Sequence, residues 1–201
     1  MIPDDAFLTI SAPSESLFKD RGSKFLGFAY PVRSEEEVRN RVLALKELHP
    51  KAVHWCYAYR IGPGRYRAND DGEPSGSAGK PILNVLYSRE VTNLLVVVVR
   101  YFGGTLLGVP GLIRAYKTAT EMALDETGLI TDFLKTTYLV SFPYDAMNAV
   151  MKAVKEMDLE IQKPVFDLMC SIEVEVRNTL APEFLARCAR AEGANITQIP
   201  D

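Results

Sequence analysis

The chain has 201 residues, of which 47% are hydrophobic and 24% are charged, a balance typical of a globular protein with material for one or two cores. Its net charge of −3 argues against tight non-specific binding to nucleic acid. A local basic face is still compatible with this net charge. The sequence contains neither an apolar run of about 20 residues nor a basic and apolar leader. We therefore expect a cytoplasmic protein without a membrane partner.

The cysteines and histidines give no metal-binding pattern. Cys56, Cys170 and Cys188 are far apart and odd in number, which argues against a disulfide framework or a structural zinc site. His49 and His54 are the only histidines, so a histidine-rich metal site is excluded. We expect no metal and no cofactor.

The first elements are a β-hairpin and a helix. Residues 16–32 predict two strands joined by a polar turn, after a weak strand candidate at residues 6–11. Ser34 and Glu37 have capping-box spacing, and apolar residues then recur at helical spacing until Pro50.

Two further strands follow. Residues 52–61 alternate, which predicts a strand with an aromatic and apolar face and an opposite face that carries His54 and Cys56. Residues 93–102 contain a continuous apolar run, Leu94 to Val99, which is followed by Arg100 and is typical of a strand buried on both faces. Helices are expected near Lys80 and from Pro110 to Gly128, with a loop between residues 62 and 79.

The last third of the chain predicts a separate domain. Its expected elements are a strand at 136–142, a helix capped by Asp145, strands at 159–166 and 168–177, a helix opened by Pro182, and a strand at 195–199. The βαββαβ order is that of the ferredoxin-like fold, and Leu168 to Val176 should alternate inward. We expect an α+β protein with two domains, residues 1–134 and 135–201.

One candidate site is the loop at residues 69–83. It joins three acids, two serines and a lysine: Asp70, Asp71, Glu73, Ser75, Ser77 and Lys80. Backbone N–H groups at the following helix start are suited to an anion. The loop resembles a nucleotide-binding P-loop, but Pro74 and Pro81 replace required residues, and we reject that interpretation.

The second candidate lies at the end of the buried strand. Arg100 needs a partner there, because an unpaired buried charge is costly, and Arg114 follows on the next helix. An external phosphate or carboxylate would make this a binding site, whereas an acid of the 69–83 loop would make it an internal clamp. We favour the clamp. A clamped loop can still present Ser75 or Ser77 to a ligand.

Two other interpretations remain open. Arg65 and Arg67 flank an aromatic residue in an acid-free stretch, which suits RNA stacking or a protein hot spot. Catalysis would rely on His54 with a loop acid and serine, or on Mg²⁺ at the acids, but the sequence has no nucleophile elbow and no EF-hand. No catalytic residue is assigned.

Three segments together resemble the signature of the IMPACT N-terminal domain. They read DDGEPSGSAGKPIL at residues 70–83, VVVVRYFGGTLLG…GLIRAY at 96–116 and HWCYAYR at 54–60. The resemblance spans about residues 15–130. The remainder resembles the small domain of bacterial members of the IMPACT/YigZ family.

The resemblance implies a first domain with the fold of a small-subunit ribosomal protein and of elongation factor G domain IV. It implies a ferredoxin-like second domain similar to elongation factor G domain V. It also implies a link to translation, since the eukaryotic relatives inhibit an amino-acid-starvation kinase by competing for its activator. For bacterial members nucleic-acid binding is the usual suggestion. Where the family commonly has Gly-Thr-Gly-Gly-Leu, this chain has Gly108-Val109-Pro110-Gly111-Leu112, which weakens an anion site there.

We therefore expect a translation-associated regulatory or binding protein whose partner is the ribosome, RNA or a translation-related protein. The alternative is a small-ligand or metal-dependent enzyme that uses the acidic loop, and both motifs can also be purely structural. The expected binding residues are His54, Arg65, Arg67, Asp70, Asp71, Glu73, Ser75, Ser77, Lys80, Arg100 and Arg114.

Overall fold

The computed structural model describes residues 4–200 as a mixed α+β protein. Its backbone contacts divide the chain into two units. The larger unit is Phe7–Asp132. The smaller unit consists of the described residues up to Ala6 together with those from Phe133 onward. The sequence division had its boundary between residues 134 and 135.

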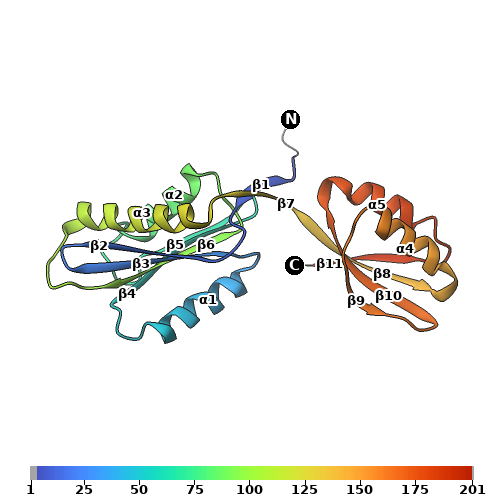
Figure 1. Ribbon diagram of the computed structural model, residues 1–201, viewed down its shortest axis with the longest axis horizontal. Helices are drawn as coiled ribbons and strands as arrows, with labels where there is room; N and C mark the ends of the chain where they lie inside the picture. The colour runs from blue at the N-terminus through green and yellow to red at the C-terminus, as the bar shows by residue number, and fades with distance from the viewer. Residues whose placement is uncertain (1–3, 201) are drawn as a thin grey trace. The chain divides into compact units, whose positions relative to one another are not determined.

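The larger unit is built on a five-stranded sheet in the order β2-β3-β6-β4-β5 (Figure 1). The strands are β2 Ser14–Asp20, β3 Ser23–Pro31, β4 His54–Ile61, β5 Arg65–Asn69 and β6 Leu94–Tyr101. All neighbouring strands are antiparallel. The predicted hairpin is confirmed. Its turn at Arg21 and Gly22 has positive φ at both residues, which matches the twist of the flanking strands.

Helices cover both faces of this sheet. α2 (Gly79–Ser88) and α3 (Gly108–Thr127) lie on one face, and α1 (Glu35–Leu48) lies on the other (Figure 1). Ser34 caps α1 by accepting the Glu37 N–H at 3.2 Å, as predicted. No helix in residues 4–200 is long and apolar enough to cross a membrane.

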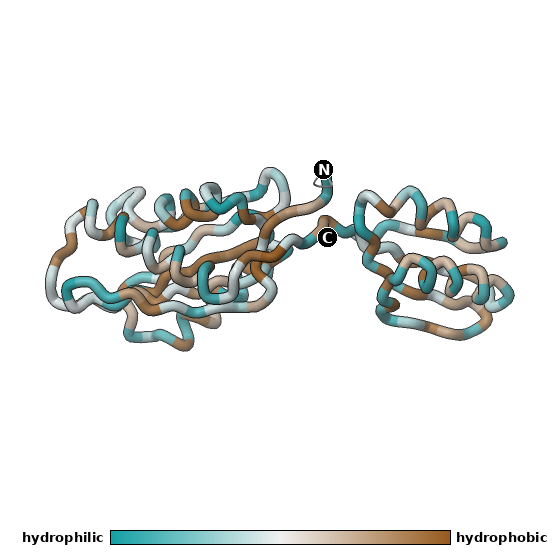
Figure 2. Tube along the Cα trace, turned by 45° about the horizontal axis from the view of Figure 1, so that its top comes forward, coloured by the Kyte–Doolittle hydropathy of each residue, from teal (hydrophilic) through white to brown (hydrophobic). Residues whose placement is uncertain are grey.

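The central position of β6 in the sheet explains its apolar run. Leu94 to Val99 are all fully buried, because alternate residues enter the α2–α3 core and the α1 core. Figure 2 shows hydrophobic residues along the central strands of this unit. β4 divides in the same way, with Cys56 in the first core and Tyr59 in the second, so the predicted alternation is confirmed.

Strand β5 was expected to be part of a loop. Its residues are largely exposed and, apart from Tyr66, polar or small, so they carry no hydrophobic alternation. It is an edge strand that pairs only with β4, and this backbone pairing makes it a strand.

The smaller unit has a four-stranded antiparallel sheet in the order β11-β8-β10-β9. Its strands are β8 Lys135–Pro143, β9 Ile161–Val165, β10 Met169–Arg177 and β11 Asn195–Ile199, and its helices are α4 Met147–Glu156 and α5 Ala181–Cys188. The chain order is strand, helix, strand, strand, helix, strand, as predicted.

Short strands β1 (Ala6–Thr9) and β7 (Ile130–Phe133) form a separate two-stranded sheet.

Two details of the smaller unit differ from the sequence predictions. Asp145 does not cap a helix, because it lies inside the 3₁₀ turn η1 (Tyr144–Ala146), and no side chain caps α4. Leu168 was expected to point inward but is 85% exposed, because it precedes β10 in the turn after β9. The inward alternation begins only at Cys170.

Asp5 is tied to the smaller unit by a buried ion pair. Its carboxylate is 4% exposed and accepts from Arg177 Nε at 2.9 Å and from Thr179 Oγ1 at 2.7 Å. Its carbonyl accepts the Leu134 N–H at 2.7 Å. The hydrogen bonds from Arg177 and Thr179 hold the pKa of the Asp5 carboxyl well below its usual range.

This lowered pKa predicts a pH-dependent contribution to stability. The ionised form of Asp5 stabilises the native state above the unfolded-state pKa of about 3.9, and this contribution is lost as the pH falls below that value. Asp5→Asn should therefore lower the melting temperature at pH 7 and narrow its gap to wild type between pH 4 and pH 2. Melting curves across this range, monitored by circular dichroism, test this. A gap that is constant with pH would contradict it.

Candidate functional site

The acidic loop is organised first by Asp70, which caps helix α2. One carboxylate oxygen accepts the N–H groups of Ala78 at 3.1 Å and Gly79 at 2.8 Å, and the other accepts that of Gly76 at 2.9 Å. These donors are the N–H groups at a helix start that an external anion would use. The anion site predicted from the sequence is therefore filled by the chain's own carboxylate.

Asp71 fixes the orientation of His54. The carbonyl oxygen of Asp71 lies 2.7 Å from His54 Nδ1, while its carboxylate accepts the Trp55 N–H at 2.8 Å and Lys46 Nζ at 3.2 Å. Asp71 has φ of 42°, and the following Gly72 has φ of 90°. Because a carbonyl oxygen only accepts hydrogen bonds, Nδ1 of His54 carries a proton, and Nε2 of the neutral ring is an acceptor.

Glu73 forms the buried clamp with Arg100. Oε1 accepts from Arg100 at 2.5 Å and from the Tyr116 hydroxyl at 2.8 Å, and the Glu73 and Arg100 side chains are 3% and 7% exposed. The guanidinium also lies over the rings of Phe25 and Phe102. The internal clamp expected for Arg100 is confirmed.

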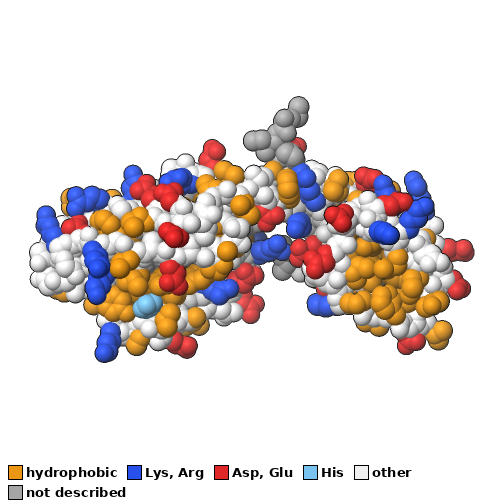
Figure 3. All heavy atoms as spheres, viewed as in Figure 1, with side chains coloured by type: hydrophobic (Ala, Val, Ile, Leu, Met, Phe, Trp, Pro, Cys, Tyr) orange, Lys and Arg blue, Asp and Glu red, His pale blue; other side chains and the backbone are white. Residues whose placement is uncertain are grey.

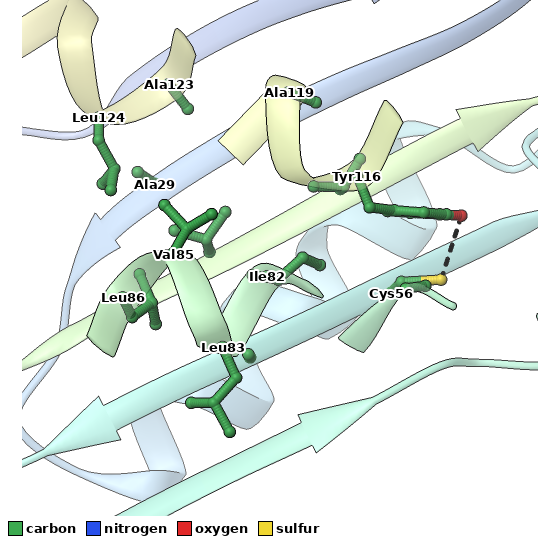
Figure 4. Close-up of a cluster of buried hydrophobic side chains, with 14 of the residues drawn as sticks. Ala29, Cys56, Ile82, Leu83, Val85, Leu86, Tyr116, Ala119, Ala123 and Leu124 are labelled. Carbon is green, nitrogen blue, oxygen red and sulfur yellow. Dashed lines mark hydrogen bonds between the residues drawn. The ribbon is translucent and has the colours of Figure 1, made fainter. Parts of the chain in front are cut away.

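Tyr116 and Cys56 extend this buried cluster beneath α3. Figure 4 shows Tyr116 pointing from α3 toward Cys56 on β4, where the sulfur and the hydroxyl oxygen are 3.2 Å apart. Burial raises the pKa of both groups well above their ordinary values. Tyr116 therefore keeps its proton and donates to Glu73, and Cys56 is a buried neutral thiol and not a nucleophile.

A pocket of about 430 Å³ lies beside the clamp. His54, Glu73 and Arg100 contribute its polar groups, and the other lining residues are Val53, Pro74, Phe102, Leu106, Leu107, Gly108, Val109 and Leu112. We define the apolar rim as Val53, Phe102, Leu106 and Val109, whose exposed fractions run from 46% to 80%. Figure 3 shows that hydrophobic side chains gather around a histidine on the visible face of this unit. Large exposed apolar residues around a hollow are typical of interaction sites.

The structure brings only part of the expected binding set to this pocket. Ser77 is fully buried and donates to the carbonyl oxygen of Pro74 at 2.6 Å, so the expectation that it faces a ligand is wrong. Ser75 and Lys80 are exposed. A catalytic arrangement of His54 with a loop acid and Ser77 does not form, because His54 contacts the backbone oxygen of Asp71 and the Ser77 hydroxyl donates to Pro74.

The expected arginines lie in other places. Arg114 on α3 pairs with Asp20 at 2.7 Å, which is an internal partner. Arg65 and Arg67 are exposed on edge strand β5 and are not among the residues that line the pocket. Within residues 4–200, no three His, Cys, Asp or Glu side chains form a group suited to a metal ion.

Sequence reasoning missed the rim and Tyr116. Tyr116 falls within the helix expected from Pro110 to Gly128, and nothing in its spacing indicates that its hydroxyl meets Glu73. The sequence does not separate Leu106 from Leu107, since both lie between the same glycines and only Leu107 packs against the core.

The fold and site define a two-unit α+β protein whose glycine-rich motifs build an ion-pair clamp beside an apolar pocket. The model of the Impact N-terminal domain matches residues 21–124. The chain therefore belongs to the IMPACT family, which confirms the resemblance seen in its motifs.

Individual relatives support this assignment. The chain is 35% identical over 153 residues to IMPACT family member YvyE of Bacillus subtilis, an alignment that covers 75% of this chain and 70% of YvyE. It is 28% identical to IMPACT family member YigZ of Escherichia coli over 92% of this chain and 93% of YigZ. A crystal structure of a hypothetical protein superimposes with a TM-score of 0.73 at 27% identity, covering 98% of each chain.

The clamp predicts a large stability effect. Glu73→Gln leaves Arg100 buried without a counter-charge, and breaking a buried ion pair in this way typically costs about 3–5 kcal/mol. Urea denaturation should show this loss. Glu121→Gln, which removes an exposed i,i+4 ion pair with Lys117, is the matched control and should change stability by less than about 1 kcal/mol. Equal midpoints for the two variants would contradict a stabilising clamp.

Proposed function

We propose that this chain is a translation-linked regulatory protein that acts by binding a protein component of the translation machinery through the apolar rim. The observation that carries the proposal is the exposure of Phe102, Leu106 and Val109 around the pocket. Leu106 alone is 80% exposed. Apolar anchors around a pocket are typical of the centre of a protein–protein interface.

The link to translation comes from the family. The eukaryotic proteins that the motifs resemble act as inhibitors of a starvation kinase. We transfer to this chain only the general principle, which is regulation through binding of a partner. The strand order β11-β8-β10-β9 supports a ferredoxin-like smaller unit similar to elongation factor G domain V. A larger unit like domain IV of that factor is part of the same proposal. A role in translation requires the cytoplasmic location that the sequence predicts.

The contacts of the acids argue against the metal-dependent alternative. Asp70 accepts three backbone N–H groups, Asp71 accepts from Lys46 and Trp55, and Glu73 accepts from Arg100 and Tyr116. A metal would have to displace these donors, two of which are positively charged. The acidic motif is thus better explained as architecture than as a ligand set for Mg²⁺.

RNA binding is the second candidate, and one observation favours it. Arg65 and Arg67 are exposed on one face of edge strand β5, and Tyr66 is exposed on the other face, where it packs edge-to-face against Tyr87. Arginines and an aromatic ring along one strand edge suit backbone contacts and base stacking. The rim lies in loops and at the start of α3, whereas this patch lies on β5, so separate substitutions distinguish the two candidates.

Co-sedimentation with ribosomes tests the proposal. Crude ribosomes, which keep associated factors, and salt-washed ribosomes are compared from 50 to 500 mM salt. Leu106→Asp should abolish co-sedimentation, while Leu43→Asp, which changes an equally apolar exposed residue on α1, should leave it intact. Melting temperatures confirm that both variants are folded.

The outcomes separate the candidates. Binding that persists at high salt and is lost only in Leu106→Asp supports a protein contact at the rim. Binding that falls steeply with salt and is lost in Arg65→Ala/Arg67→Ala indicates RNA instead. Absence of binding to either ribosome preparation contradicts the proposal.

A further inference from the structure

The pocket beside the clamp has polar groups that the chain leaves unused. Glu73 Oε1 accepts two hydrogen bonds, but Oε2 accepts none from the described residues. Nε2 of His54 also has no hydrogen-bond partner there and lies 3.9 Å from Glu73 Oε2. Both residues line the pocket, and the Glu73 side chain is only 3% exposed. Glu73 is a nearly buried carboxylate and the His54 side chain is 23% exposed, so both free atoms can take a hydrogen bond from a molecule that enters the pocket. Arg100 Nε, which also has no hydrogen-bond partner among the described residues, is fully enclosed.

The two free atoms are both acceptors when His54 is neutral. The Asp71 carbonyl takes the proton of Nδ1, which leaves Nε2 with a lone pair, and the Glu73 carboxylate has only lone pairs. A separation of 3.9 Å is too long for a direct hydrogen bond. A single atom that carries two hydrogens fits between them and donates to each. An NH₂ group has this property.

Charge selects an uncharged NH₂ group. The Glu73 carboxylate is already balanced by the Arg100 guanidinium, so an added cation would be buried without a counter-charge of its own. The strand register also places Arg100 directly opposite His54, which sets a positive group beside the site. An anionic ligand group would meet the free oxygen of Glu73 and be repelled.

The rest of the pocket selects an apolar body. Phe102, Leu107, Val109 and Leu112 line the walls, and the volume of about 430 Å³ is that of a small-ligand site. A flat ring is the simplest body that contacts these walls while its substituent reaches the floor.

We propose that this pocket binds a small uncharged molecule that carries a primary carboxamide on an apolar ring, with the amide NH₂ group between His54 Nε2 and Glu73 Oε2. This ligand site goes beyond the proposed partner contact and does not depend on it, because its selectivity comes from His54 and Glu73 on the floor of the pocket, although it shares the wall residues Phe102 and Val109 with the rim.

A series of matched probes tests the chemistry. Benzamide is titrated into the full chain at pH 8, where a histidine side chain is ordinarily neutral, and amide shifts are followed by NMR. Benzamide should produce saturable shifts of His54, Glu73 and Phe102. N,N-dimethylbenzamide lacks both donors, benzoate is an anion and benzamidinium is a cation, and each should bind at least about tenfold more weakly.

Two variants on helix α3 test where benzamide binds. Val109→Trp fills the pocket from its exposed rim without touching the clamp and should abolish benzamide binding. Ile113→Trp, one turn further on, faces a different groove and should leave binding unchanged. Both positions are partly exposed, so both variants should keep the wild-type melting temperature.

Several outcomes would overturn the inference. An absence of saturable shifts would mean that the floor holds water only. Binding of N,N-dimethylbenzamide that equals that of benzamide, or tighter binding of benzamidinium, would contradict the proposed hydrogen bonds and charge. Loss of benzamide binding in Ile113→Trp but not in Val109→Trp would overturn the location. Ribosome co-sedimentation is measured separately. A negative benzamide titration can therefore be distinguished from a negative result for the proposed function.

Discussion

The buried carboxylate of Glu73 connects three parts of the larger unit that are far apart in the sequence. Glu73 lies in the loop after β5, Arg100 ends the central strand β6, and Tyr116 comes from helix α3. An ionised pair away from water is stable only if both charges are matched and hydrogen-bonded. The loop, the strand and the helix therefore have to assemble together, and the rest of the site follows from their assembly.

The neighbouring acids fix the loop around this pair. Asp70 caps α2, and the Asp71 carboxylate accepts the backbone N–H of Trp55 near the start of β4 while its carbonyl orients His54. Each carboxylate has a different set of donors. This explains why three acids within four residues can be accommodated despite their mutual electrostatic repulsion. A motif that suggests catalysis or metal binding by composition is thus largely a device that holds loop and sheet together.

The family assignment and the geometry address different questions. Membership of the IMPACT family rests on the match over residues 21–124 and explains why the glycine-rich motifs occur together. It does not identify which surface acts. The geometry adds that most motif side chains are engaged internally, and that an apolar rim with two free acceptors beneath it is what this region offers to other molecules.

The sequence by itself determined the elements with strong periodicity and the need for a counter-charge at Arg100. The apolar run of β6 predicted burial on both faces, and an arginine at its end required an internal or external counter-charge. It did not predict β5, since an edge strand made of polar residues depends on backbone pairing alone. Only the tertiary structure decided that the partner is Glu73, that Tyr116 shares it, and that Ser77 is buried. These facts depend on which residues of β4, β6 and α3 meet across the fold, and local spacing carries no information about such long-range contacts.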